Sequence, residues 1–560
     1  MLSRSFTVSG TLLACFLQSL TVIAASAALY GGDVRSQYDF IVVGGGTAGN
    51  AVATRLSHYL PHASILVLEA GHPAPDEDRI NIPGLKGSTL GTKYDWNFTS
   101  IPQPQLNNRV ITQSRGKVLG GTSALNLMIW DRASKAEYDG WEQLGNPGWG
   151  WSNMIIAMEK AENFSSYNCP DYTRTTDFGT RGPIHAVVDR YMPPHQATWL
   201  PTFANLGVDE NKAWLGGENV GAAYHSSTIN PSNYSRSYSA VAYLPRAGPN
   251  VKVVTGVEVA KVNLVRKVGG CVATGVTLTD GAIITARHEI IVSAGTLQSP
   301  PLLEQSGIGN TSLLREAGIR PLIDLPGVGE NLQDHPRIQI AYQLKDNYTS
   351  FDRLKYDAAY ATVQRKLYDA GHISAYDYAA SAYSYQSWSS IVDNTKQNEL
   401  IEAAKRAAAK LSNVVDDKKL EWLVSPTLSS RIAQAEFLLS DGYSGLKGYP
   451  SKNSTLYGQG FTTIFAALMH PLARGSAHIN ATDPAAKPIY SPAFASNEYD
   501  LRFEAMPAEN RPSLTCIGLS WNYPSTSVAL RLLHPSPRSG STNTSPVSTL
   551  PPTSNGRTLS

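Results

Sequence analysis

Six consecutive residues near the start of the chain have the types and spacing of a phosphate-binding turn. The run Gly44-Gly45-Gly46-Thr47-Ala48-Gly49 satisfies G-x-G-x-x-G. In such a turn Gly44 permits a tight bend, Gly46 lets the backbone approach a diphosphate, and Gly49 allows a helix to pack closely on a strand. The helix that starts at residues 47–50 would offer free N–H groups and the positive end of its dipole to the phosphates.

The flanking sequence predicts the β-α-β unit that must position this turn. Residues 38–43 and 65–68 are short apolar runs typical of strands buried on both faces, and residues 50–59 form the intervening helix. The apolar positions near helical spacing are Ala51, Val52, Leu56 and Tyr59. Glu69 lies twenty positions after Gly49, where an acceptor for ribose hydroxyls belongs. The unit indicates a dinucleotide site rather than an ordinary glycine-rich turn, but it does not choose between FAD and NAD.

Length and composition indicate a folded protein with more than one domain. A chain of 560 residues is too long for one core, and its 42% hydrophobic and 16% charged residues fit a globular protein. The formal net charge of +2 gives no reason to expect nucleic acid or an anionic membrane as a partner. We expect no metal site, and the oligomeric state stays open.

The N-terminus predicts entry into the secretory pathway. Residues 1–27 combine basic Arg4, an apolar run at 12–23 and a small-residue cleavage site ending at Ala27. An uncleaved anchor is less suitable, because polar residues interrupt the apolar run and it is short for a membrane span. No later stretch is expected to cross a bilayer. Seven N-x-S/T sequons are candidate glycosylation sites: Asn97, Asn163, Asn233, Asn310, Asn347, Asn453 and Asn480.

The cysteines add little. Cys15 falls in the predicted signal, which leaves Cys169, Cys271 and Cys516 and room for at most one intrachain disulfide. A bond between Cys169 and Cys271 and two free thiols remain equally good alternatives.

Further glycine-rich blocks follow along the chain. Residues 115–130 contain Gly120 and Gly121 followed by hydroxyl residues, which suits a backbone pressed against a ligand but also an ordinary tight turn. Residues 293–309 again read as a strand end, a turn and a helix. Residues 331–336, Asn-Leu-Gln-Asp-His-Pro, form a turn-dense crossover. Its His335 by itself is best read as a hydrogen-bonded loop histidine.

Together these blocks resemble the glucose–methanol–choline (GMC) oxidoreductase family, most closely its secreted fungal members such as aryl-alcohol oxidases, glucose oxidases and secondary-metabolite dehydrogenases. The matching elements, in order, are the G-x-G-x-x-G turn with Glu69, residues 115–130, residues 295–309, residues 331–336 and the segment His470-Pro471-Leu472-Ala473-Arg474-Gly475-Ser476. The resemblance implies that the dinucleotide is FAD.

The resemblance also implies an α/β fold, in which a Rossmann-like FAD-binding domain carries an inserted α+β substrate domain built on an antiparallel sheet. The FAD domain would comprise residues 37–150 and 221–325, and the substrate domain residues 151–220 and 326–495. An alanine-rich helix over residues 397–411 would cover the outer side of that sheet. The aromatic residues of 376–388 would line an access channel or lie on a surface loop.

Roles follow for the matched positions. Thr47 and Ala48 would face the diphosphate, Glu69 would bind the adenosine ribose, and Trp96 would lie by the flavin-binding turn. Residues 126–129 would run under the isoalloxazine ring, and the backbone of Val259, in a strand pair around residues 251–264, would meet adenine. The cofactor-binding set is therefore Gly44, Gly46, Thr47, Ala48, Gly49, Glu69, Trp96, Gly120, Gly121, Asn126, Leu127, Met128, Ile129 and Val259.

The C-terminal part departs from the family pattern. The family's catalytic histidine sits in an H-x-G-T-x-x-M-like motif, with a second histidine or asparagine later, and this sequence contains neither. From about Met506 the match stops, and no Asp, Glu or Lys follows Glu509. Residues 506–560 therefore read as an atypical segment, with a disordered, Ser-, Thr- and Pro-rich end over 535–560. His534 lacks the family context, so no catalytic residue is assigned.

Three explanations of this segment stay open: a shifted reading frame or retained intron, a true truncation, and a FAD fold used for non-redox chemistry. We favour the first, because charge and hydrophobic periodicity disappear together. The expected activity is FAD-dependent oxidation of a small-molecule alcohol, aromatic or from secondary metabolism, to an aldehyde or ketone. Oxygen or a quinone would reoxidise the flavin. The alternatives are a non-redox cyclase on the same fold and an inactive flavin-binding remnant.

Overall fold

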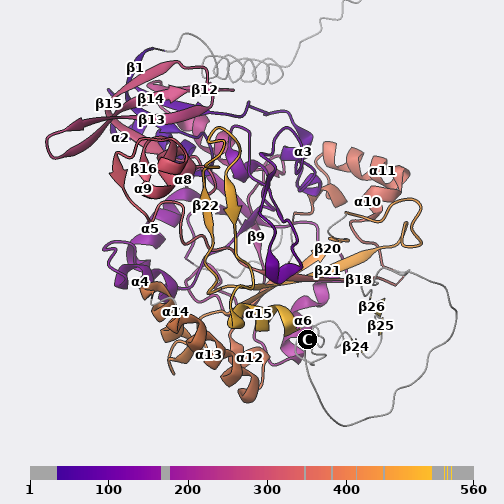
Figure 1. Cartoon of the computed structure of the whole chain (residues 1–560). Coiled ribbons are helices and arrows are strands. Elements are labelled where there is room, and N and C mark those ends of the chain that lie inside the picture. Colours follow the sequence, from indigo (N-terminus) through magenta and orange to yellow (C-terminus); the bar gives the residue numbers. More distant parts are fainter. Residues whose placement is uncertain are drawn as a thin grey trace, which may run out of the picture.

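The computed structural model describes most of the chain as one folded body (Figure 1). The described residues are 35–165, 177–345, 348–379, 382–410, 413–445, 448–506 and the short strands at 522–523, 526–527 and 531–532. The predicted signal, Cys169, Cys516, His534 and the sequon at Asn347 lie outside these residues.

A six-stranded mixed sheet forms the first layer. Its order is β12-β2-β1-β15-β14-β13. The strands are β1 (Gln37–Val43), β2 (Ile65–Glu69), β12 (Val251–Thr255), β13 (Val259–Lys267), β14 (Gly270–Leu278) and β15 (Ile283–Val292). The first four in that order pair in parallel, whereas β14 pairs antiparallel with both β15 and β13. The pairing of β1 with β2 confirms the predicted β-α-β unit.

The strand pair expected around residues 251–264 is wrong. β12 and β13 lie at opposite edges of the sheet, and β13 pairs with β14 instead. Consecutive apolar strands suggest a hairpin in the sequence, but β12 adds in parallel to β2, and Gly256 turns the chain away with a φ of 73°.

Helix α2 (Thr47–Tyr59) connects β1 to β2, as predicted, but its buried face differs from the predicted apolar face. The buried residues are Gly49, Asn50, Ala53, Thr54 and Ser57, and Tyr59 is 65% exposed. Small side chains face inward because the helix packs directly against backbone, which leaves no room for large ones.

The second layer is the expected antiparallel sheet, in the order β19-β20-β21-β18-β26. Its strands are β18 (Arg337–Gln343), β19 (Ala382–Gln386), β20 (Ala435–Asp441), β21 (Phe461–Leu468) and β26 (Arg531–Leu532). All neighbouring pairs are antiparallel. Together with the first sheet, this confirms the predicted α/β fold class.

Helix α13 (Asn394–Ala409) corresponds to the helix expected over residues 397–411. Its Leu400, Ala403 and Ala404 belong to the same core as Phe437 and Leu439 of β20, so it covers one face of the sheet. Within the aromatic stretch at 376–388, residues 382–386 form β19 with Tyr383 and Tyr385 buried, so the surface-loop alternative is wrong for these residues.

A third, four-stranded sheet joins the two regions. Its order is β5-β9-β7-β6, from β5 (Ile129–Trp130), β6 (Glu162–Ser165), β7 (Ile184–Val188) and β9 (Ser226–Ser227). Its strands come from chain ranges assigned to both domains. At its edge the buried Arg132 guanidinium donates to Glu162, and the Trp130 indole donates to the same carboxylate over 2.6 Å.

The remaining elements are short. The helices are α3 (Asp78–Asn81), α4 (Lys135–Gln143), α5 (Trp151–Ala161), α6 (Trp199–Asn205), α7 (Ser239–Tyr243), α8 (Ser299–Gln305), α9 (Thr311–Glu316), α10 (Arg353–Tyr356), α11 (Ala358–Asp369), α12 (Trp388–Ile391), α14 (Val414–Val424) and α15 (Glu498–Ala505). The 3₁₀ turns are η1 (Pro83–Leu85), η2 (Pro104–Leu106), η3 (Gly121–Ala124), η4 (Gln196–Thr198), η5 (Leu244–Arg246) and η6 (Ala375–Asp377). The small strands are β3 (Phe98–Thr99), β4 (Thr112–Gln113), β8 (Gly221–Tyr224), β10 (Ile229–Asn230), β11 (Ser235–Arg236), β16 (Ile308–Gly309), β17 (Ile323–Asp324), β22 (Ser476–His478), β23 (Ile489–Ser491), β24 (Asn522–Tyr523) and β25 (Thr526–Ser527).

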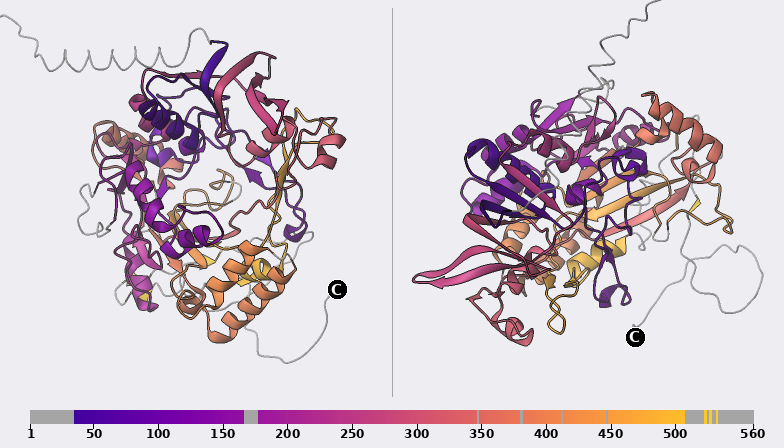
Figure 2. Two further views of the ribbon diagram at one scale, coloured as in Figure 1. Left: turned by 90° about the vertical axis from the view of Figure 1, so that its left-hand side faces the viewer. Right: turned by 90° about the horizontal axis from the view of Figure 1, so that it is seen from above.

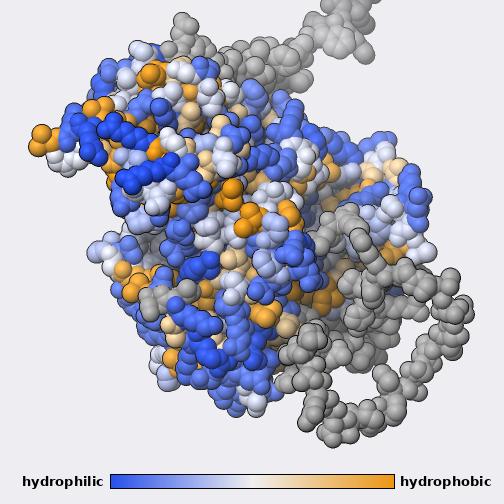
Figure 3. Space-filling model, in the orientation of Figure 1, coloured by the Kyte–Doolittle hydropathy of each residue, from blue (hydrophilic) through white to orange (hydrophobic). Residues whose placement is uncertain are grey.

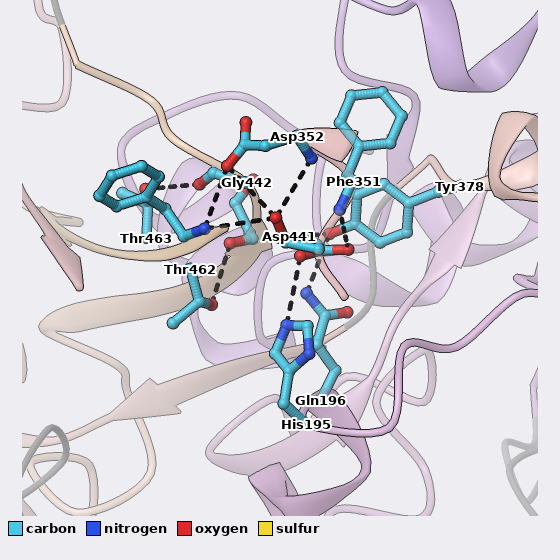
Figure 4. Close-up of polar contacts among 12 residues, drawn as sticks. His195, Gln196, Phe351, Asp352, Tyr378, Asp441, Gly442, Thr462 and Thr463 are labelled. Atoms are coloured by element: carbon cyan, nitrogen blue, oxygen red, sulfur yellow. Dashed lines mark hydrogen bonds and ion pairs between the residues drawn. The ribbon is translucent and has the colours of Figure 1, made fainter. Parts of the chain in front are cut away.

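A buried polar cluster fixes the end of β20 (Figure 4). His195 Nε2 lies 3.2 Å from Asp441 Oδ1, and both side chains are fully buried. The Tyr378 hydroxyl accepts from the Asp441 N–H and from the Gln196 amide. The cluster ties the sheet to the loop before α6, because Tyr378 bonds both Asp441 and Gln196 and because His195 lies against Asp441.

The first sheet and helices α12–α14 lie at opposite ends of the molecule, as Figure 1 and the left view of Figure 2 show. Hydrophilic residues dominate the face in Figure 3, with hydrophobic residues in small groups. Within the described residues, no helix is long and apolar enough to cross a bilayer.

Among the sequons, Asn233 and Asn453 are exposed, but glycosylation and secretion stay predictions. Within the described residues Cys271 forms no disulfide, and the alternative of a bond to Cys169 lies outside them.

We predict that Arg132→Met destabilises the protein by about 3–5 kcal/mol, because it leaves the Glu162 carboxylate buried without its counter-ion. The matched control is Arg431→Met, which removes an exposed ion pair with Glu218 and should cost less than about 1 kcal/mol. Urea unfolding followed by circular dichroism measures both. Equal losses in the two variants would contradict the role given to the buried pair.

Candidate active site

A cavity of about 810 Å³ lies where β1 and β2 end. In open sheets with parallel strands, ligands bind beyond the carboxyl ends of the strands. The predicted cofactor residues that line the cavity are Gly44, Gly46, Thr47, Ala48, Glu69, Trp96, Gly121 and Val259. Residues scattered over more than 200 positions therefore meet at one site.

Gly44, Gly46 and Gly49 of the turn differ in why the structure needs a glycine there. A Cβ on Gly44, whose φ is 102°, would lie 2.4 Å from the Ser293 carbonyl oxygen, and a Cβ on Gly49 would lie 1.9 Å from the Gly44 oxygen. A Cβ on Gly46 would come no closer than 3.7 Å to Gly121 Cα. Gly44 and Gly49 are thus required by packing within the protein, whereas Gly46 opens towards the cavity.

Glu69 lies at the end of β2 and is held by backbone donors. Its carboxylate accepts from the Gly45 N–H over 2.8 Å and from the Gly71 N–H over 2.7 Å. Burial raises the pKa of Glu69 to about 7, against the lowering effect of these hydrogen bonds and of Lys117. The carboxyl group therefore changes charge near neutral pH.

The second glycine block supports the first. The Gly120 N–H donates to the Gly45 carbonyl over 2.8 Å, and a Cβ on Gly121 would lie 2.7 Å from Gly46 Cα. Both have positive φ, 104° and 55°. The two turns thus meet backbone to backbone. A Cβ on Gly120 would meet the Tyr238 ring, and Gly120 does not line the cavity.

Residues 126–129 lie apart from this cavity and line none of it. Asn126 and Leu127 are exposed, Met128 is buried with a φ of 66°, and Ile129 begins β5. The segment presents a polar and an apolar side chain to open space. A positive φ at Met128 turns the chain sharply between η3 and β5.

Arg236, which is not in the predicted set, fixes the segment 126–129 through hydrogen bonds to Asn126. Its guanidinium donates to the carbonyl oxygens of Ile80 and Asn126 and to the Asn126 side chain over 2.7–2.8 Å. Burial lowers its pKa to about 10, so it stays charged at neutral pH. A single arginine between serines gives no signal of this role in the sequence.

Trp96 and Val259 both line the cavity, from separate parts of the chain. The Trp96 ring stacks on Phe98 at 6.0 Å, and the Lys117 ammonium lies 4.2 Å from its centre. Val259 begins β13 at the sheet edge. The ring is therefore fixed by packing and by a cation–π contact.

Two further segments line the cavity. The turn at 293–299 overlaps the motif at 295–309, although no cofactor-binding residue is predicted there, and the loop at 483–488 has no signal in the sequence. The loop is fastened where the His478 ring contacts Glu304 over 2.7 Å and Glu330 over 3.2 Å. These two acids raise the pKa of His478. A loop so remote in sequence carries no local pattern that predicts its position.

His335 is an exposed loop residue, and desolvation by the surrounding chain together with the nearby His470 lowers its pKa. His470 contacts Glu137 over 2.9 Å. The loop position of His335 is as predicted, whereas its ring has no hydrogen bond among the described residues, where only its backbone N–H donates to Asp334.

The model of the GMC oxidoreductase family matches residues 38–337, which contain all of the cavity lining except the loop at 483–488. The chain belongs to this family. Among curated GMC relatives, dehydrogenase citC of Monascus ruber is 32% identical, with 84% of this chain and 79% of the relative covered. GMC oxidoreductase family protein Mala s 12 of Malassezia sympodialis is 33% identical, with 83% and 74% covered.

Solved structures give the same result for the GMC fold. An FAD-dependent oxidoreductase from Chaetomium thermophilum is 28% identical with a TM-score of 0.73, covering 86% of this chain and 83% of that one. A fungal aryl-alcohol oxidase is 25% identical with a TM-score of 0.69, covering 87% and 84%. The resemblance drawn from the motifs is thereby confirmed, and membership of the family implies an FAD-dependent oxidoreductase.

We predict that Gly49→Ala destabilises the protein by about 1–3 kcal/mol, because the new methyl group would overlap the Gly44 carbonyl. Gly46→Ala is the matched control and should change stability by less than about 0.5 kcal/mol, since its methyl group meets open space. Thermal unfolding without added cofactor compares them. A Gly49→Ala protein as stable as the control would contradict the packing argument.

Proposed function

We propose that this GMC oxidoreductase binds FAD in the 810 Å³ cavity and oxidises an alcohol to an aldehyde or ketone. The observation that carries the proposal is the convergence in one cavity of the glycine turn, the Glu69 carboxylate and the second glycine block. That set of donors and acceptors suits a dinucleotide diphosphate with its ribose.

The residues present fit FAD. Gly46 leaves the space into which a diphosphate would fit, and no side chain caps the N-terminus of α2, so its N–H groups stay available to phosphate. Glu69 is a buried acceptor for ribose hydroxyls, and Val259 would meet adenine. Thr47 and Ala48 would face the diphosphate.

The ring end of the cofactor would lie along residues 126–129, beside Trp96. Bound there, the isoalloxazine ring of FAD would accept a hydride at N5 from the carbinol carbon. The role of Arg236 is to hold the Asn126 carbonyl and side chain in one orientation. The protein thereby keeps the polar groups under the ring fixed before a substrate arrives.

An aromatic alcohol is the first substrate class to test, because one structural neighbour is an aryl-alcohol oxidase. One relative, citC, is named a dehydrogenase, so we propose a quinone alongside oxygen as the electron acceptor that reoxidises the flavin. The missing family histidine keeps a non-redox cyclase as the alternative.

We predict that Glu69→Gln weakens FAD binding about 10- to 100-fold, because a neutral amide cannot accept from both the Gly45 and Gly71 N–H groups. Wild-type affinity should rise as pH rises through about 7, since a ribose hydroxyl favours the ionised carboxylate and lowers the pKa of Glu69 on binding. The variant should lose this pH dependence. FAD fluorescence titration measures both, with exposed Glu316→Gln as the control. Unchanged affinity in Glu69→Gln would exclude the assigned ribose contact.

We predict that benzyl alcohol, added anaerobically to the FAD-loaded protein, bleaches the flavin absorbance at about 450 nm. Recovery of the band with air or with a quinone identifies the acceptor. Product formation with an unchanged spectrum would instead favour cyclisation, and a protein that takes up no FAD would refute the proposal.

A further inference from the structure

Three ionisable side chains from three elements meet beside the antiparallel sheet. Asp131 directly follows β5, Tyr385 is on β19 and Glu436 is on β20. The Tyr385 hydroxyl donates to Asp131 Oδ2 over 2.5 Å. Tyr385 also lies directly opposite Glu436 in the strand ladder, so the two side chains extend from the same face of the sheet, and interaction with Tyr385 lowers the pKa of Glu436 against the larger raising effect of burial.

If both acids are ionised, the three side chains have one proton too few for Tyr385 to be hydrogen-bonded to both carboxyl groups. The single hydroxyl proton of Tyr385 can serve only one carboxylate, so the other would face the hydroxyl oxygen without a hydrogen bond. One added proton completes the chain, with the protonated acid donating to Tyr385 and Tyr385 donating to the remaining carboxylate. Burial of Tyr385, which is 5% exposed, makes an unmet hydrogen bond costly.

No cation among the described residues compensates this pair. The adjacent Arg132 is directed to Glu162, and the groups that face the acids, Tyr138, Tyr383 and Tyr385, are neutral tyrosines. His225 stacks on Tyr383 at 5.8 Å, and burial lowers its pKa to about 4, so it is uncharged at neutral pH. If both acids were ionised, their negative charges would therefore repel each other without a counter-ion.

The titration of the pair agrees with this geometry. Burial and the nearby Asp131 raise the pKa of Glu436 to about 8, and burial raises the pKa of Asp131 as well. Interacting acids titrate as a pair, so these shifts belong to both. Asp131 and Glu436 keep partial exposure, which gives the shared proton a route to solvent.

We propose that Asp131 and Glu436, bridged by Tyr385, are the acid–base group that accepts the hydroxyl proton of the alcohol. This inference rests on the proposed function, because it places the pair beside the ring end of the cofactor. Asp131 lies two residues after Ile129 in the segment assigned to the ring, and Glu436 is connected to it through Tyr385, which bonds Asp131 and pairs with Glu436 across the strands. A general base with a pKa near the working pH suits the task.

The step balances as follows. The O–H proton of the alcohol passes to an ionised carboxyl group of the pair, and the C–H hydrogen leaves with its bonding electrons for the FAD ring. The electron pair left on oxygen forms the C=O bond of the product. The pair then carries one extra proton, which it releases to solvent before the next turnover.

The test uses FAD-loaded protein and anaerobic stopped-flow reduction by benzyl alcohol over a range of pH. We predict that Glu436→Gln lowers the rate constant of flavin reduction roughly 100-fold. Asp131→Asn should shift the pH profile to lower pH, because removal of the neighbouring charge lowers the pKa of Glu436. Tyr385→Phe should shift it to higher pH through loss of a donor to the carboxylate. Exposed Glu316→Gln is the control and should match the wild type.

A second readout needs no substrate. Infrared pH titration of the oxidised protein should show the C=O band of a protonated carboxyl group that disappears only above neutral pH, is lost in Glu436→Gln and titrates at lower pH in Asp131→Asn. Absence of that band in the wild type would overturn the shared proton. Reduction rates in Glu436→Gln equal to those in the control would overturn the catalytic role alone. Failure of every alcohol to reduce the wild-type flavin would instead overturn the proposed function, and the catalytic role with it.

Discussion

Close approach of backbone to backbone at the end of β1 is the constraint on which this structure depends. The first glycine turn touches the chain before α8 at Gly44, helix α2 at Gly49 and the second glycine block at Gly46 and Gly121. A side chain at Gly44, Gly49 or Gly121 would force two segments apart. Because all these segments end at one point, the same contacts that close the core also create the cavity above it.

Buried charges fix the surroundings of that cavity. Glu69 is held by two backbone N–H groups, Arg236 by carbonyl oxygens, and Arg132 by Glu162. Each charge is costly to bury, so each restricts the local backbone to conformations that supply its partners. The chain from Asn126 to Arg132 is thus positioned at both ends, which also fixes Asp131 beside the Tyr385 hydroxyl.

Much of the binding site could be predicted because its signals are local. The β-α-β unit, Glu69 and the block at 115–130 each follow from short patterns whose physics is complete within a few residues. The inward face of α2 was predicted wrongly for the same reason. Apolar spacing describes the helix alone, whereas its buried face is chosen by the neighbouring backbone, which admits only small residues such as Gly49 and Ala53.

The sequence by itself determined the dinucleotide turn, the family and the two kinds of sheet, because glycine spacing, apolar strands and ordered motifs are properties of the chain read locally. Only the tertiary structure decided which distant side chains share a site. Arg236 behind Asn126, the loop at 483–488 over the cavity, and Tyr385 between two acids depend on strands brought together across hundreds of residues. Burial then decides their chemistry, since a carboxyl group at the surface and the same group beside Tyr385 differ in the water and charges around them.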